Sequence, residues 1–186
     1  MPSPFDQSRY QVRLEHGTAG LRRLAASDVV VVVDVLAGGG ADAALAAEAA
    51  AGGSLILRGD LRTAGAVARA VLAEQQRRGS RTSVAIVTVD AADDAGAARE
   101  PAEDRLGAGA VVDALAAVGI DHTSPEAAVA CEAFRGLRGA VRHLLTASGT
   151  GQELVAAGRR DDVLAAAAID ADDAVAVWRD GRFEPR

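Results

Sequence analysis

The chain has 186 residues, of which 49% are hydrophobic and 25% are charged, and this composition is sufficient for one folded domain with a sizeable core. Its formal net charge is −6 at pH 7, and no basic stripe is interleaved with aromatic residues, so a nucleic-acid partner is not expected. With one cysteine, no apolar run of membrane-spanning length and no leader-like N-terminus, we expect a cytoplasmic protein with no internal disulfide and no membrane partner.

Strands and helices alternate in the first half of the chain. Residues 11–15 alternate polar and apolar side chains, which is typical of an edge strand, and residues 29–33 are all valine, which indicates a strand buried on both faces within 28–36. The other expected elements are a helix over 21–25, a glycine loop over 38–40, a helix over 41–51, a strand over 54–58, a helix capped by Asp60 and ending near 78, and a strand over 82–89.

The second half of the chain is mainly helical. Its expected elements are an exposed loop over 91–99, a helix from about 100 to 119, a helix capped by Ser124 and ending near 135, helices over 137–168 with a break at 147–151, and a final strand from 175 followed by a tight turn. We predict an α/β fold over residues 1–186, a single-domain, largely parallel sheet flanked by helices in αβα layers.

Asp34 is the strongest candidate for a functional residue. A carboxylate that interrupts so apolar a strand is costly unless something pairs with it, and the carboxyl ends of parallel strands are where α/β sheets bind ligands. Gly38, Gly39 and Gly40 follow directly and open a helix, so their N–H groups are candidates for binding an anion. The alternative is that these glycines form only a flexible turn.

Arg58, Asp60 and Asp90 also follow predicted strands, so a parallel sheet would gather them with Asp34 along one edge. Carboxylates, a divalent metal and an arginine together suit phosphoryl chemistry, because the cations offset the phosphate charge. Taken singly, Arg58 is equally well explained as a solvated charge, Asp60 as a helix cap and Asp90 as a turn residue.

A second candidate is the helix start at Glu103 and Asp104, whose ordinary role would be to interact with the helix dipole. Gly107 and Gly109 follow inside the same helix, where each costs ~1 kcal/mol relative to Ala, so we expect this helix to pack closely on another backbone.

Ser148 does not lie in a nucleophile elbow, although its hydroxyl and N–H are available to an anion. Cys131 is expected to be an inert helix residue. The three histidines lack metal-ligand spacing, and we expect all of them at the surface: His16, His122 and His143.

Several segments resemble, in this order, the 2-phosphosulfolactate phosphatase family. The most specific are the strand end Val33-Asp34-Val35-Leu36 and the helix Glu103-Asp104-Arg105-Leu106-Gly107-Ala108-Gly109-Ala110. The resemblance implies a Mg²⁺-dependent phosphatase acting on a small anionic phosphorylated substrate, with or without a sulfonate group. It also implies that Asp34, Glu103 and Asp104 are the catalytic residues and that Asp34 and Asp104 hold the metal.

The candidates for substrate contacts remain those that the residue patterns indicate, namely Gly38, Gly39, Gly40, Arg58 and Ser148. The chain departs from the family pattern in two places. A stretch of the usual fold is missing after Leu36, and the Gly-Glu-Arg expected after the third strand is replaced by Val89-Asp90-Ala91-Ala92. The alternative function is therefore a catalytically inactive relative that serves as a binding or assembly module.

The missing stretch leads to an expectation about assembly. It would leave an apolar edge or face of the sheet uncovered, and such a face is rarely tolerated in a monomer. We therefore expect a homodimer. We also expect Asp34 to face a cleft within reach of Glu103 or Asp104.

Overall fold

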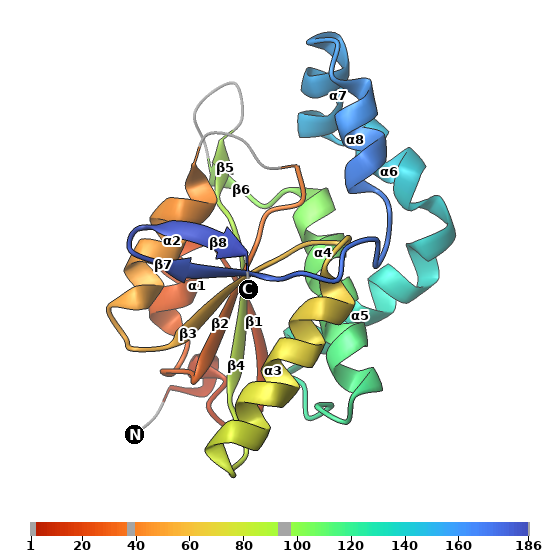
Figure 1. Cartoon of the computed structure of the whole chain (residues 1–186). Coiled ribbons are helices and arrows are strands. Elements are labelled where there is room, and N and C mark those ends of the chain that lie inside the picture. The colour runs from red at the N-terminus through yellow and green to blue at the C-terminus, as the bar shows by residue number, and fades with distance from the viewer. Residues whose placement is uncertain (1–2, 37–39, 93–97, 186) are drawn as a thin grey trace.

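The computed structural model describes residues 3–36, 40–92 and 98–185 (Figure 1). The strands are β1 (Val12–His16), β2 (Val29–Val33), β3 (Leu55–Gly59), β4 (Val84–Thr88), β5 (Ala91–Ala92), β6 (Ala98–Arg99), β7 (Ala176–Arg179) and β8 (Arg182–Pro185). The helices are α1 (Gly17–Arg23), α2 (Ala41–Ala50), α3 (Ala64–Arg78), α4 (Ala102–Ala117), α5 (Pro125–Leu137), α6 (Val141–Ala147), α7 (Gly149–Ala156) and α8 (Arg160–Ala166), with short 3₁₀ turns at Pro4–Asp6 and Arg138–Ala140.

A six-stranded sheet has the order β1-β4-β2-β3-β7-β8. The first four strands are parallel, and the β7–β8 hairpin continues the sheet in antiparallel pairing beside β3. The α/β class, the mainly parallel sheet and the terminal hairpin are therefore confirmed. Because β1, β2, β3 and β4 run in the same direction, their carboxyl ends meet at one edge of the sheet, where Asp34 and Asp90 follow β2 and β4.

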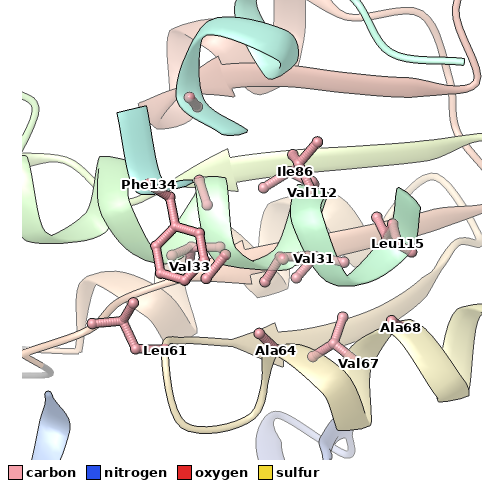
Figure 2. Close-up of a cluster of buried hydrophobic side chains, with 14 of the residues drawn as sticks. Val31, Val33, Leu61, Ala64, Val67, Ala68, Ile86, Val112, Leu115 and Phe134 are labelled. Carbon is pink, nitrogen blue, oxygen red and sulfur yellow. The ribbon is translucent and has the colours of Figure 1, made fainter. Parts of the chain in front are cut away.

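The five valines of β2 alternate between two hydrophobic clusters. Val30 and Val32 face α1 and α2, where Leu45 and Ala46 cover them. Val29, Val31 and Val33 belong to the larger cluster on the opposite face, and Figure 2 shows Val31 and Val33 against side chains of α3 and α4. This is why the run is apolar throughout, since a strand with helices on both sides has no solvent-facing position.

The close packing expected of α4 is confirmed. A Cβ on Gly107 would lie 2.5 Å from Val35 Cγ2 of the segment after β2, and a Cβ on Gly109 would lie 2.1 Å from the carbonyl oxygen of Ala130 in α5. These two glycines let the helix approach both the sheet edge and its neighbour, and the approach at Gly107 brings the first turn of α4 towards Asp34.

Gly109→Ala is expected to destabilise the fold by roughly 1–3 kcal/mol or more, because the added methyl group meets a backbone oxygen that can move only with α5. Gly136→Ala, in α5, is the matched control. Nothing lies within 4 Å of its added Cβ, and it is expected to stabilise the chain by about 0.5–1 kcal/mol. Urea unfolding of both variants measures the difference, and equal midpoints would contradict the packing argument.

Three local expectations are wrong. The cap of α3 is Thr63 and not Asp60, whose Oδ1 accepts hydrogen bonds from the Thr63 N–H and hydroxyl. The first helix begins at Gly17 and ends at Arg23, before the expected residues 21–25 are complete. Residues 91–99 are not simply a loop, because β5 and β6 pair at its two ends.

The expected uncovered apolar face is not found among the described residues. Their exposed large apolar side chains are Phe5, Val129 and Leu137, which form no extended surface. At the β1 edge, the Val12 N–H donates to the His122 carbonyl and the Ser124 N–H donates to the Val12 carbonyl, so the loop before α5 covers part of this edge. Within the described ranges, no helix is long and apolar enough to cross a membrane.

Candidate functional site

Asp34 lies at the carboxyl edge of the sheet, directly after β2. It is 5% exposed, and burial raises the pKa of its carboxyl to about 6. The positive charge of Arg58 acts in the opposite direction, while the negative charges of Asp42, Glu103 and Asp60 raise the pKa further. A carboxylate in these surroundings is costly to ionise without a cation beside it.

Glu103 and Asp104 occupy the first turn of α4, and each is 2% exposed. Asp104 Oδ1 accepts a 2.7 Å hydrogen bond from the N–H of Val35, which links this turn to the residue after Asp34. Burial raises the pKa of Asp104 to about 8 despite that hydrogen bond, and the charges of Asp34, Glu103 and Glu100 add to the rise. The structure thus brings three buried acids to one place.

One carboxylate oxygen of Glu103 is in an unusual environment. Its Oε2 is buried and has no hydrogen-bond partner among the described residues. Buried carboxylate oxygens are normally paired, and leaving one unpaired costs about 1–3 kcal/mol or more. An unpaired oxygen beside two other acids is therefore a candidate contact for a cation or a water molecule.

These acids line a cavity of about 670 Å³, which is large enough for a small organic substrate. The acidic side chains come from the sheet edge and α4 and form the acidic wall of the cavity, and a second part of the lining comes from Arg99, α7 and the turn before α8. The lining residues are Asp34, Leu36, Ala41, Val89, Asp90, Ala91, Arg99, Pro101, Glu103, Asp104, Thr150, Glu153, Leu154, Ala157 and Arg159. Arg99 donates to the Thr150 hydroxyl at 3.2 Å, and Arg159 pairs with Asp162.

Arg58 and Gly40 lie near the acids but do not line the cavity. The Arg58 Nε is buried, 3.5 Å from Asp42 Oδ2, without a hydrogen bond of good geometry. Gly40 is the N-cap of α2 with a positive φ of 77°, and nothing lies within 4 Å of where its Cβ would be. Gly38 and Gly39 lie outside the described residues. Of the three glycines expected to bind an anion, the structure therefore describes only Gly40.

The Ser148 hydroxyl forms hydrogen bonds with backbone groups. It accepts from the Gly151 N–H as the cap of α7 and donates to the Leu145 carbonyl, and Ser148 does not line the cavity. Thr150, two residues later, does. Sequence reasoning overlooked Arg99, Thr150 and Arg159, since the docking of short helices over a sheet edge leaves no local pattern.

The histidines divide into two groups. His122 and His143 are exposed, as expected. The one cysteine, Cys131, is buried in α5, and burial raises the pKa of its thiol. His16 is not a simple surface residue: its side chain is about a quarter exposed and contacts Thr88 and Asp90. Asp90 lines the cavity, as its position after β4 predicts.

The donor chemistry of the acidic wall fits Mg²⁺, a hard cation that binds carboxylate oxygens. In the part of the chain that the structure describes, no three metal-ligating side chains converge into a complete site. Mg²⁺ does not require one, because it is commonly held by one or two carboxylates together with water and a substrate phosphate. The unpaired oxygen of Glu103 and the raised pKa values of Asp34 and Asp104 are consistent with a bound cation.

A family model described as 2-phosphosulpholactate phosphatase matches residues 40–181. The matched range contains Glu103, Asp104 and the α7–α8 wall of the cavity, and it begins after Asp34. No curated protein matches the chain.

Proposed function

The chain belongs to the 2-phosphosulpholactate phosphatase family, and we propose that it is a Mg²⁺-dependent phosphatase that releases phosphate from a small phosphorylated organic acid. The observation that carries the proposal is the set of three buried acids, one with an oxygen that has no partner among the described residues, on a wall of the cavity of about 670 Å³. Such a cluster is stable as an anion only beside a cation, and a cation at the phosphate lowers the barrier to hydrolysis of the ester by offsetting its negative charge.

Asp34 and Asp104 would hold Mg²⁺, because they come from adjoining segments and both are costly to ionise alone. The ion would offset negative charge on the phosphate. Glu103, with its unpaired Oε2, would orient the attacking water, and Asp104 is the other candidate for that role. Burial keeps bulk water away from these acids and strengthens every electrostatic contact that they make.

Substrate binding would involve both walls of the cavity. Arg99 and Thr150 offer N–H and hydroxyl donors in the same cavity as the acids, which suits a substrate with a second anionic group. Gly38 to Gly40 would offer backbone N–H groups to the phosphate, and Arg58 would contribute long-range positive charge. Because the Ser148 hydroxyl is committed to its cap, Thr150 is the better candidate for a hydroxyl contact from this loop.

The test is phosphate release from 2-phosphosulfolactate and from 2-phospholactate, measured with Mg²⁺ and again with excess EDTA. We expect turnover with Mg²⁺ and its loss with EDTA. Absence of turnover on both substrates with Mg²⁺ would reject the phosphatase. Calorimetric binding of either ester without turnover would then favour the inactive relative.

The homodimer and the cytoplasmic location remain predictions. The dimer was expected from an uncovered apolar face, and the described surface lacks one, so any dimer would need a polar or smaller contact.

A further inference from the structure

His16 and Asp90 form a pair at the carboxyl edge of the sheet. His16 is the last residue of β1, Asp90 follows β4, and the two strands are neighbours with His16 opposite Thr88. His16 Nε2 lies 3.3 Å from Asp90 Oδ1, and His16 Nδ1 lies 3.0 Å from the Thr88 hydroxyl. Both ring nitrogens therefore have a polar partner.

The direction of these hydrogen bonds follows from Glu100. Arg105 pairs with Glu100, so that carboxylate is ionised and only accepts hydrogen bonds. The Thr88 hydroxyl must then donate its single hydrogen to Glu100 Oε1, which lies 3.1 Å away. Its oxygen accepts from His16 Nδ1, which fixes a proton on that nitrogen.

One more proton is needed between His16 and Asp90. A neutral imidazole protonated at Nδ1 would turn an unprotonated Nε2 towards the carboxylate, and two acceptors would then face each other. The 3.3 Å contact becomes a hydrogen bond only when a proton sits on Nε2 or on Asp90 Oδ1. A hydrogen bond at this contact therefore requires one proton shared between the His16 ring and the Asp90 carboxylate.

The residues around Asp90 hold its carboxylate in one position. Asp90 Oδ2 accepts a 3.1 Å hydrogen bond from the Thr18 N–H. Gly17 has a φ of 63°, and a Cβ there would lie 2.0 Å from Asp90 Oδ1, so only glycine leaves room for it. The start of α1, at Gly17 and Thr18, thus holds the acid in place.

Asp90 lines the same cavity as Asp34, and its side chain is 46% exposed, whereas His16 does not line the cavity. The nearby charged groups are mostly paired. Glu100 binds Arg105, and Glu15, beside His16 in the chain, binds Arg23. Asp90 is therefore the member of the pair that reaches the cavity, and His16 contacts it without lining the cavity.

We propose that Asp90 is the general acid of the phosphatase, protonating the leaving oxygen of the substrate, and that His16 is the positioning residue that supplies the proton. This inference rests on the proposed function. In the step, the oxygen of water bonds to phosphorus, and a water proton passes to the acidic wall. The bond between phosphorus and the ester oxygen breaks with its electron pair on that oxygen, which takes the proton from Asp90. His16 is left neutral, and solvent restores the proton.

The experiment compares two esters whose leaving groups differ in basicity. An alkyl phosphate, 2-phospholactate, leaves as a strongly basic alkoxide and needs protonation, whereas 4-nitrophenyl phosphate leaves as a weakly basic phenolate and does not. For Asp90→Asn we expect kcat on the alkyl ester to fall about 100-fold or more, with little change on the aryl ester. His16→Gln is expected to show the same selective loss, because glutamine can donate to Asp90 but cannot carry a transferable proton.

Asp121→Asn and His143→Gln are matched controls, since both side chains are exposed and lie outside the cavity. They should leave both rates unchanged. Retained aryl hydrolysis shows that the Asp90 and His16 variants are folded. Equal losses on both esters, or no loss on either, would overturn the inference while wild-type turnover leaves the phosphatase standing. Absence of wild-type turnover on both esters and on 2-phosphosulfolactate would reject the phosphatase and the inference together.

Discussion

Asp34→Asn is expected to abolish Mg²⁺-dependent phosphate release, lowering kcat at least about 100- to 1000-fold, while the fold is retained. Asparagine keeps the shape of the side chain and loses the charge that would hold the cation. Because Asp34 is buried next to Glu103 and Asp104, losing its charge also relieves repulsion among the acids, so we expect no loss of stability. The measurement is steady-state hydrolysis of 2-phosphosulfolactate over a range of Mg²⁺ concentrations.

The control for this variant is Asp173→Asn, which removes an exposed carboxylate before β7 and should keep full activity. Both proteins are purified in parallel with the wild type, so a contaminating phosphatase would give all three the same activity. Equal turnover by Asp34→Asn and wild type, after that check, would remove Asp34 from the mechanism. A thermal shift with Mg²⁺ in the wild type but not in Asp34→Asn would support the metal role independently of turnover.

The sheet and its carboxyl edge were predictable because their signals are local. The valine run of β2 can be buried only between two layers of helices, and the order of strands and helices then places Asp34 and Asp90 at one edge. Gly107 and Gly109 indicated close packing, because glycine in a helix interior is unfavourable unless a neighbour needs the space.

The second wall of the cavity was not predictable in the same way. Its position depends on how α6 packs on α4 and how α7 and α8 then pack on α6, which is decided by tertiary packing and leaves no periodic signal near Thr150 or Arg159. His16 was misjudged for a related reason. Its neighbours in sequence are polar, and its partners Thr88 and Asp90 come from β4, which becomes adjacent only when the sheet forms.

The pH dependence of folding provides a test that does not require turnover. In the folded chain the pKa of Asp104 is raised to about 8, whereas in the unfolded chain it returns to about 3.8. Between these values the folded state holds a proton that the unfolded state has lost. The free energy of unfolding therefore decreases as the pH rises from about 4 to about 8, and this contribution is constant above the folded pKa. Asp34, with a pKa of about 6, adds a smaller decrease between about 4 and 6.

Asp104→Asn is expected to remove the larger part of this dependence. The amide cannot ionise, and its oxygen can still accept the hydrogen bond from the Val35 N–H. Without metal, the variant should be more stable than the wild type by a few kcal/mol at about pH 8.5 and nearly equal to it at about pH 4. Urea unfolding in EDTA across that range measures the effect.

Adding Mg²⁺ at the higher pH should stabilise the wild type more than Asp104→Asn, because a cation beside the ionised carboxylate lowers its pKa and offsets its burial cost. Parallel stability curves for the two proteins in EDTA would show that Asp104 is not the buried acid responsible, and an equal response to Mg²⁺ would remove it from the metal site.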